Sequence, residues 1–151
     1  MKNLFEKETF DEIALRLNQI NSNADRKWGK MTVAQMLAHA ATPLEYALGD
    51  KKGKQSIMGM LFKPFAKNVF FEEKPYKQNL PTAPEFKISE ADQKQFDAEK
   101  TKLTDLLNRF HQTGKHVAGN HQHLFLGKIT ADEWARTMYK HLDHHFRQFG
   151  V

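Results

Sequence analysis

The sequence predicts an all-α protein: a four-helix bundle with a long crossover between the second and third helices. Four capping boxes, each a Ser or Thr followed three residues later by an acid or Gln, are typical of helix starts. Apolar residues follow each box at three- and four-residue spacing, as on one face of a helix. No strand-like alternation competes, so four amphipathic helices are expected to pack together.

Length and composition favour one folded domain spanning residues 1–151. The chain is 40% hydrophobic and has 12 phenylalanines, enough apolar surface to offset the entropy lost on folding. It has no cysteine, which excludes disulfides, thiolate ligands and a cysteine nucleophile. A transition-metal site would therefore use histidine and carboxylate.

The first helix is expected to begin near Thr9, in the box TFDE, and the second near Thr32, in TVAQ. Gly49 stands where the second helix should end, and Pro43 should kink or weaken it because proline lacks an amide donor. The expected buried stripes are Phe10, Ile13, Ala14, Leu17 and Ile20 in the first helix, and Val33, Met36, Leu37, Ala40, Leu44 and Ala47 in the second.

Residues 50–88 form the crossover, which is longer than usual helix connections and contains four prolines. Its apolar and basic stretch 56–71 is interpreted first as a short helix packed on the bundle. A segment that binds a membrane surface or a partner is the alternative.

The third helix is expected to begin near Ser89, in SEAD, and to end at Gly114. The fourth should begin near Thr130, in TADE, and end at Gly150. Their expected stripes are Phe96, Leu103, Leu106, Leu107 and Phe110, and then Trp134, Met138, Leu142, Phe146 and Phe149.

The charge pattern does not favour nucleic acid as a partner. The net charge is +5, but basic residues are interleaved with acids except near residues 50–54 and 62–68. The first residues lack the apolar run of a signal peptide, and no stretch reaches the roughly 18 apolar residues of a membrane span. We therefore expect a cytoplasmic protein.

The chain closes with KHLDHHFRQFG, in which three histidines fall within five positions. A helix turns about 100° per residue, which places His141 and His145 beside the apolar stripe and His144 well away from it, toward solvent. Two imidazoles one turn apart can share a divalent ion. Partly buried histidines satisfied by hydrogen bonds are the alternative interpretation.

A catalytic metal usually needs a third protein ligand. His39, on the flank of the second helix, is the only other histidine predicted inside a helix. Asp143 is expected on the solvent side of the last helix. Gln148, on the histidine side, is interpreted first as a partly solvated amide, with a residue that orients a ligand as the alternative. The remaining histidines are expected at a helix end or in a solvated loop: His111, His116, His121 and His123.

Two segments carry a resemblance to a known family. MTVAQMLAH in the second helix, combined with HxxHH in the last, resembles the DinB/YfiT-like superfamily of metalloenzymes. The blocks WGKMTVAQMLAH, PLEYALG and LGKITADEWARTMYKHLDHHFRQFGV are similar to an uncharacterised, mainly bacterial branch of it. These blocks lie at the two ends of the chain, whereas residues 50–120 carry little of the match.

The resemblance implies a four-helix bundle that holds zinc, nickel or another divalent ion through three histidines. Matched position by position, these are His39, His141 and His145. Members of the superfamily include S-transferases and isomerases that use a low-molecular-weight thiol, and others proposed as hydrolases. Metal affinity is expected to fall as the pH drops through about 6.5, the ordinary imidazole pKa.

The functional hypothesis is a metal-dependent enzyme for a small-molecule substrate, acting as a thiol-dependent S-transferase or as a hydrolase. The sequence identifies no general acid or base. The alternatives are a helical binding module without metal and a basic protein that binds membrane surfaces. A second copy of the chain, forming a homodimer, is one of the partners considered.

Overall fold

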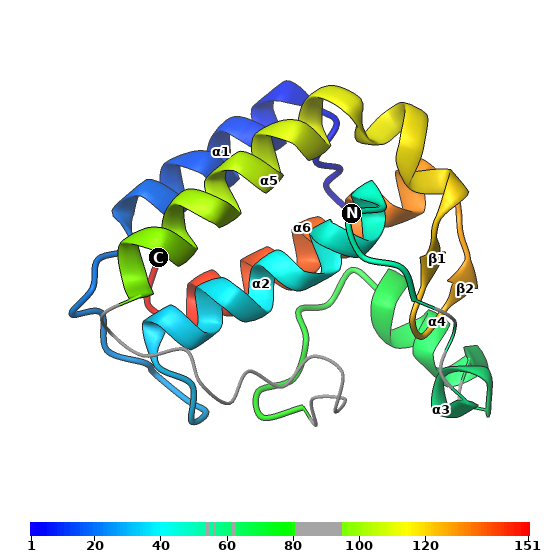
Figure 1. Cartoon of the computed structure of the whole chain (residues 1–151). Coiled ribbons are helices and arrows are strands. Elements are labelled where there is room, and N and C mark those ends of the chain that lie inside the picture. The colour runs from blue at the N-terminus through cyan, green and yellow to red at the C-terminus, as the bar shows by residue number, and fades with distance from the viewer. Residues whose placement is uncertain (54, 56, 62, 81–94) are drawn as a thin grey trace.

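A computed structural model describes residues 1–53, 55, 57–61, 63–80 and 95–151. The described residues are mostly helical, which confirms the predicted helical class. Four long helices dominate: α1 (Lys7–Gln19), α2 (Val33–Leu48), α5 (Phe96–Val117) and α6 (Ala131–Gln148). Figure 1 shows α1 running beside α5, with α2 and α6 side by side beneath them.

The four long helices share one hydrophobic core. α2 contacts both α5 and α6, and α1 also contacts both. Of the predicted stripes, only Phe10 and Ala14 of the first helix are not fully buried, and those of the other three helices are buried throughout. Large side chains in the hydrophobic core include Phe110 and Phe146, each 0% exposed. Burial of such stripes is the main force that holds amphipathic helices together.

Local capping chemistry sets both ends of α2 and α6. Thr32 and Thr130 are N-caps, and each forms a complete capping box with the residue three positions on. Gly49, at the C-cap of α2, has φ +81°, and Gly150, just past α6, has φ +84°. Both glycines adopt the left-handed conformation that closes a helix end. These predictions are confirmed.

Two predicted boundaries are wrong. The first helix begins at Lys7 with Glu6 as N-cap, because the carbonyl of Glu6 already accepts from the amide of Phe10. Thr9 lies inside α1 and is buried. At the other boundary, α5 continues past Gly114 to Val117, because Gly114 packs closely against aromatic side chains rather than ending the helix. The predicted start near Ser89 lies outside the described residues.

The crossover between α2 and α5 carries two short helices, α3 (Ile57–Leu61) and α4 (Lys63–Phe71). α4 packs on α6, which confirms a helix packed on the long helices. Lys140 of α6 donates to the carbonyls of Val69 and Glu72, 2.5 and 2.6 Å away, and so ties the end of α4 to α6. α2 itself runs through Pro43 as one helix.

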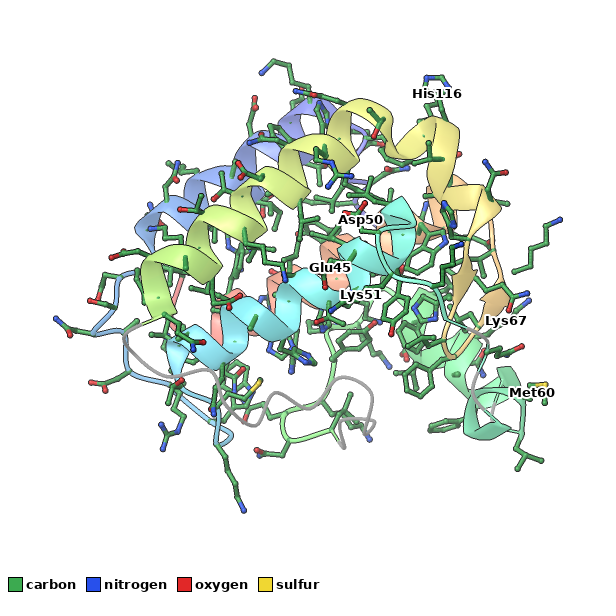
Figure 2. The ribbon with its side chains drawn as sticks, in the orientation of Figure 1. Glu45, Asp50, Lys51, Met60, Lys67 and His116 are labelled. Carbon is green, nitrogen blue, oxygen red and sulfur yellow. The ribbon has the colours of Figure 1, made fainter. Side chains whose placement is uncertain are left out.

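α3 and α4 present an exposed apolar face. Met60, Leu61 and Phe65 are 58%, 70% and 70% exposed, and Figure 2 shows Met60 and Lys67 at this end of the molecule, far from Glu45 of α2. Within the described part of the chain, no helix combines the length and apolar character needed to cross a membrane.

A small antiparallel sheet joins α5 to α6, which the sequence did not predict. A 3-10 turn, η3 (Ala118–Asn120), leads into β1 (Gln122–His123), which pairs with β2 (Gly127–Lys128). His123 lies opposite Gly127, whose φ of +69° suits glycine. The strands have two residues each, too short to show alternation in the sequence.

Candidate metal centre

Three histidine side chains from two helices converge. His39 comes from α2, and His141 and His145 from α6. The Nε2 atoms of His39 and His141 are 3.0 Å apart, and one ligand atom from each of the three residues lies within 4.8 Å of the other two. His39 and His145 are buried, and His141 is partly buried.

The packing of α2 against α6 brings the third histidine to the pair. His141 and His145 share one face of α6 because they are one turn apart. His39 is 5% exposed rather than on a flank, because α6 covers the side of α2 that carries it. Its ring centroid is 4.9 Å from that of His141 and 4.6 Å from that of His145.

The geometry of this cluster fits a divalent ion. Zinc binds imidazole nitrogen at about 2.0–2.1 Å, so the nitrogens of a tetrahedral site lie about 3.3 Å apart. The Nε2 atoms of His39 and His141 are already near that spacing, and the ligand atoms of all three residues lie within 4.8 Å of one another. Three neutral imidazoles are also the ligand set of a catalytic site that keeps a coordination position open.

Gln148 orients one of the three histidines. The Nδ1 of His145 donates to Oε1 of Gln148 at 2.9 Å, and Nε2 of Gln148 donates to the carbonyl of Trp28 at 2.8 Å. This arrangement places the proton of His145 on Nδ1 and leaves Nε2 as the lone-pair donor, as is typical of metal-binding histidines. Gln148 is 3% exposed, so its interpretation as a partly solvated amide is wrong.

Burial keeps the two histidines of α6 uncharged. Desolvation, and then the nearby His39, lower the pKa of His145 to about 3. Desolvation and the neighbouring imidazoles lower the pKa of His141 well below its usual value. His141 and His145 thus present neutral lone pairs at neutral pH, which is the form that binds metal.

His144 does not point freely into solvent, which corrects its predicted surface position. Its side chain is partly buried, and its ring packs against Trp28 and Tyr76, with centroids 5.7 Å away in both cases. The ring also contacts His145, with centroids 5.0 Å apart. Residues distant in the chain cover the side of α6 that the rotation of about 100° per residue had placed toward solvent.

Asp143 is also buried, at 7% exposure, so the prediction of a surface charge is wrong. It forms an ion pair with Arg16 of α1 at 2.8 Å and another with Arg147 at 3.0 Å. Arg16 additionally donates to the carbonyl of Val151 at 3.0 Å. Asp143 therefore joins α6 to α1, whose Arg16 also holds the end of the chain, rather than serving the histidine cluster.

Among the remaining histidines, His123 was expected in a solvated loop but is 4% exposed. Its Nδ1 accepts from the amides of Phe125 and Leu126, closing the turn between β1 and β2. Burial lowers the pKa of His123 to about 3, so the ring stays neutral as the acceptor role requires. His111 contacts the carbonyl of Leu4 at 2.8 Å.

Glu45 of α2 is engaged by two lysines. It pairs with Lys51 at 2.6 Å and Lys102 at 2.8 Å, and Figure 2 shows Glu45 and Lys51 close together. The side chains that sequence reasoning missed near the cluster are Trp28 and Tyr76. Neither has a local sequence signal, because each reaches the cluster only through folding.

Comparison with known proteins identifies one family. The family described as a protein of unknown function, DUF1569, matches residues 4–150. No curated protein and no solved structure matches the chain.

Proposed function

Because the chain belongs to the DUF1569 family, whose description assigns no function, we propose one from the site itself: a divalent-metal-dependent enzyme for a small molecule. One observation carries the proposal. Three buried or partly buried histidines offer nitrogen ligands within 4.8 Å of one another. Imidazoles that have given up solvation together are better explained by a shared cation than by hydrogen bonds among themselves.

The three histidines and Gln148 have separate roles in this proposal. His39, His141 and His145 hold the ion, with zinc or nickel the metals that suit imidazole ligands. Gln148 fixes the orientation of His145 through the carbonyl of Trp28. A zinc ion held by these residues would lower the pKa of bound water to about 7, or bind a thiol as thiolate.

The resemblance to the DinB/YfiT-like superfamily supports this proposal. It also supports reading α1, α2, α5 and α6 as that superfamily's four-helix bundle, with residues 49–95 as the crossover. Two reactions remain candidates: transfer to a low-molecular-weight thiol, and hydrolysis. Either reaction would need a deprotonated nucleophile, which a metal held by the same three histidines would supply.

Zinc- or nickel-loaded protein, prepared without an affinity tag, is expected to catalyse one of these reactions. The assays are conjugation of 2-mercaptoethanol to a chloronitrobenzene and hydrolysis of a nitrophenyl ester. His145→Ala, which lacks one metal ligand, is the inactive control. His116 is an exposed histidine on α5, so His116→Ala should behave as wild type. If metal-loaded wild type is no faster than His145→Ala in either assay, an enzymatic function is contradicted.

A second candidate function, binding to an anionic membrane surface, is favoured by the exposed face of α3 and α4. Met60, Leu61 and Phe65 project there, and the exposed Lys67 lies on α4. Apolar side chains near a lysine suit the boundary between lipid headgroups and acyl chains.

The protein should therefore bind phosphatidylserine-containing vesicles, and Phe65→Ser should weaken binding by about thirtyfold because about 2 kcal/mol of apolar burial is lost. Cosedimentation measures the bound fraction as salt increases. Leu15→Ser, at an apolar residue 60% exposed on α1, is the control. Binding to uncharged vesicles alone, or equal loss in both variants, would exclude this surface.

A further inference from the structure

Two buried hydrogen-bond donors beside the histidine cluster have no partner among the described residues. They are the indole Nε1 of Trp28 and the hydroxyl of Tyr76. Each side chain is only partly buried as a whole, but these two polar atoms are inaccessible to solvent. Buried polar groups are hydrogen-bonded in the great majority of cases, so a donor left unpaired needs an explanation.

Both donors belong to rings that pack on His144. The centroids of Trp28 and Tyr76 each lie 5.7 Å from that of His144, which is itself 5.0 Å from His145. Trp28 precedes α2, Tyr76 follows α4, and His144 lies on α6, so three separate segments meet here. Trp28 is also linked to the cluster through its carbonyl, which accepts from Gln148.

The charges around these donors favour a negatively charged acceptor. The ammonium group of Lys140 lies 4.6 Å from the ring centroid of Tyr76 and is 5% exposed as a residue. Asp143, next to His144 in the chain, is engaged by Arg16 and Arg147. Burial raises the pKa of Tyr76, so its hydroxyl remains a donor at neutral pH.

We propose that Trp28 and Tyr76 form an oxyanion-binding subsite, which holds a carboxylate of the substrate beside the three-histidine cluster. Their N–H and O–H groups, both on rings that pack on His144, match the acceptor oxygens of a carboxylate, and the Lys140 ammonium lies beside Tyr76. This inference rests on the proposed function, in which the substrate is a small molecule. The substrate is then a small carboxylic acid that reacts at an atom other than those of its carboxylate.

The test is a titration of the full-length protein with acetate, in metal-free and zinc-loaded form, followed by the two indole N–H resonances in nitrogen-15 NMR. The Trp28 resonance should shift downfield and saturate as it gains an acceptor. The Trp134 resonance is an internal control, because its Nε1 already donates to the carbonyl of His121 at 3.4 Å. Trp28→Phe assigns the responding resonance.

Tyr76→Phe should weaken acetate binding by about tenfold or more, since it removes one hydrogen bond to a charged group. Tyr139→Phe, at a partly buried tyrosine elsewhere on α6, should bind as wild type. An unresponsive Trp28 resonance, or unchanged affinity in Tyr76→Phe, overturns the subsite. If the protein binds zinc but the Trp28 resonance does not shift, the subsite is excluded and the proposed metal-dependent function is not. If the Trp28 resonance shifts but the protein binds no metal, the proposed function is excluded and the subsite is not.

Discussion

Untagged wild-type protein supplemented with zinc should bind one ion, and His145→Ala should lose nearly all of it. His145 is the buried ligand whose lone pair Gln148 directs, so no other nitrogen replaces it. An ion that binds only the folded state, present at about 1,000 times its dissociation constant, adds about 4 kcal/mol to the unfolding free energy. Chelation should lower the melting temperature of the wild type by about 10 °C, and that of His145→Ala hardly at all.

The same measurements on His39→Ala and His141→Ala should match those on His145→Ala. His144→Ala is the neighbouring control, since His144 lies outside the group of three convergent ligands and should leave metal content nearly unchanged. Elemental analysis gives the stoichiometry, and circular dichroism the melting curve. Equal metal losses in His144→Ala and His145→Ala would show that the three-histidine assignment is wrong.

The structure also shifts the expected pH range of metal loss. Since the pKa of His145 is about 3 in the folded protein, protons compete for this ligand only well below the ordinary value of about 6.5. Metal should therefore remain bound after dialysis at about pH 5.5. Unfolded histidines take up protons below about pH 6.5, so the unfolding free energy falls steadily from there toward the folded pKa.

Asp143→Ala should destabilise the fold by about 2 to 3 kcal/mol, because it leaves the partly buried guanidinium of Arg16 without its main partner. The side chains of Arg16 and Asp143 are 15% and 9% exposed, so solvent restores little of the lost interaction. Urea denaturation measures the unfolding free energy.

Lys7–Asp11 is the matched control pair. It also joins a basic residue of α1 to an aspartate, at 2.6 Å, but its side chains are 81% and 53% exposed. Asp11→Ala should cost less than about 0.5 kcal/mol. A double-mutant cycle should give clear coupling for Arg16 with Asp143 and almost none for Lys7 with Asp11. Similar coupling in the two pairs would refute the buried role of Asp143.

Much of the helical fold could be predicted because its signals are local. The capping boxes at Thr32 and Thr130 satisfy amides within one turn, so neither depends on distant residues. The box at Thr9 failed because nothing local stopped α1 from beginning at Lys7, where Glu6 already accepts the first helical hydrogen bond. The two-residue strands β1 and β2 form only through pairing with each other, which periodicity cannot detect.

The candidate site was predictable to a lesser degree. That His141 and His145 share one side of a helix follows from their spacing. His39 was joined to them by resemblance, since its own helix layout left it on a flank. The pairing of these residues with a metal stays a prediction, whereas their convergence is a feature of the structure.

By itself the sequence determined the helical class, most of the buried stripes and the shared face of the two last-helix histidines, because each depends on residues within a few turns. Tertiary structure decided the environments of Asp143, His144 and Gln148. The partner of Asp143 on α1 is 127 residues away, and the carbonyl that holds Gln148 is 120 residues away. Burial and charge are set by such distant neighbours, so a helix layout alone cannot say which polar face another segment will cover.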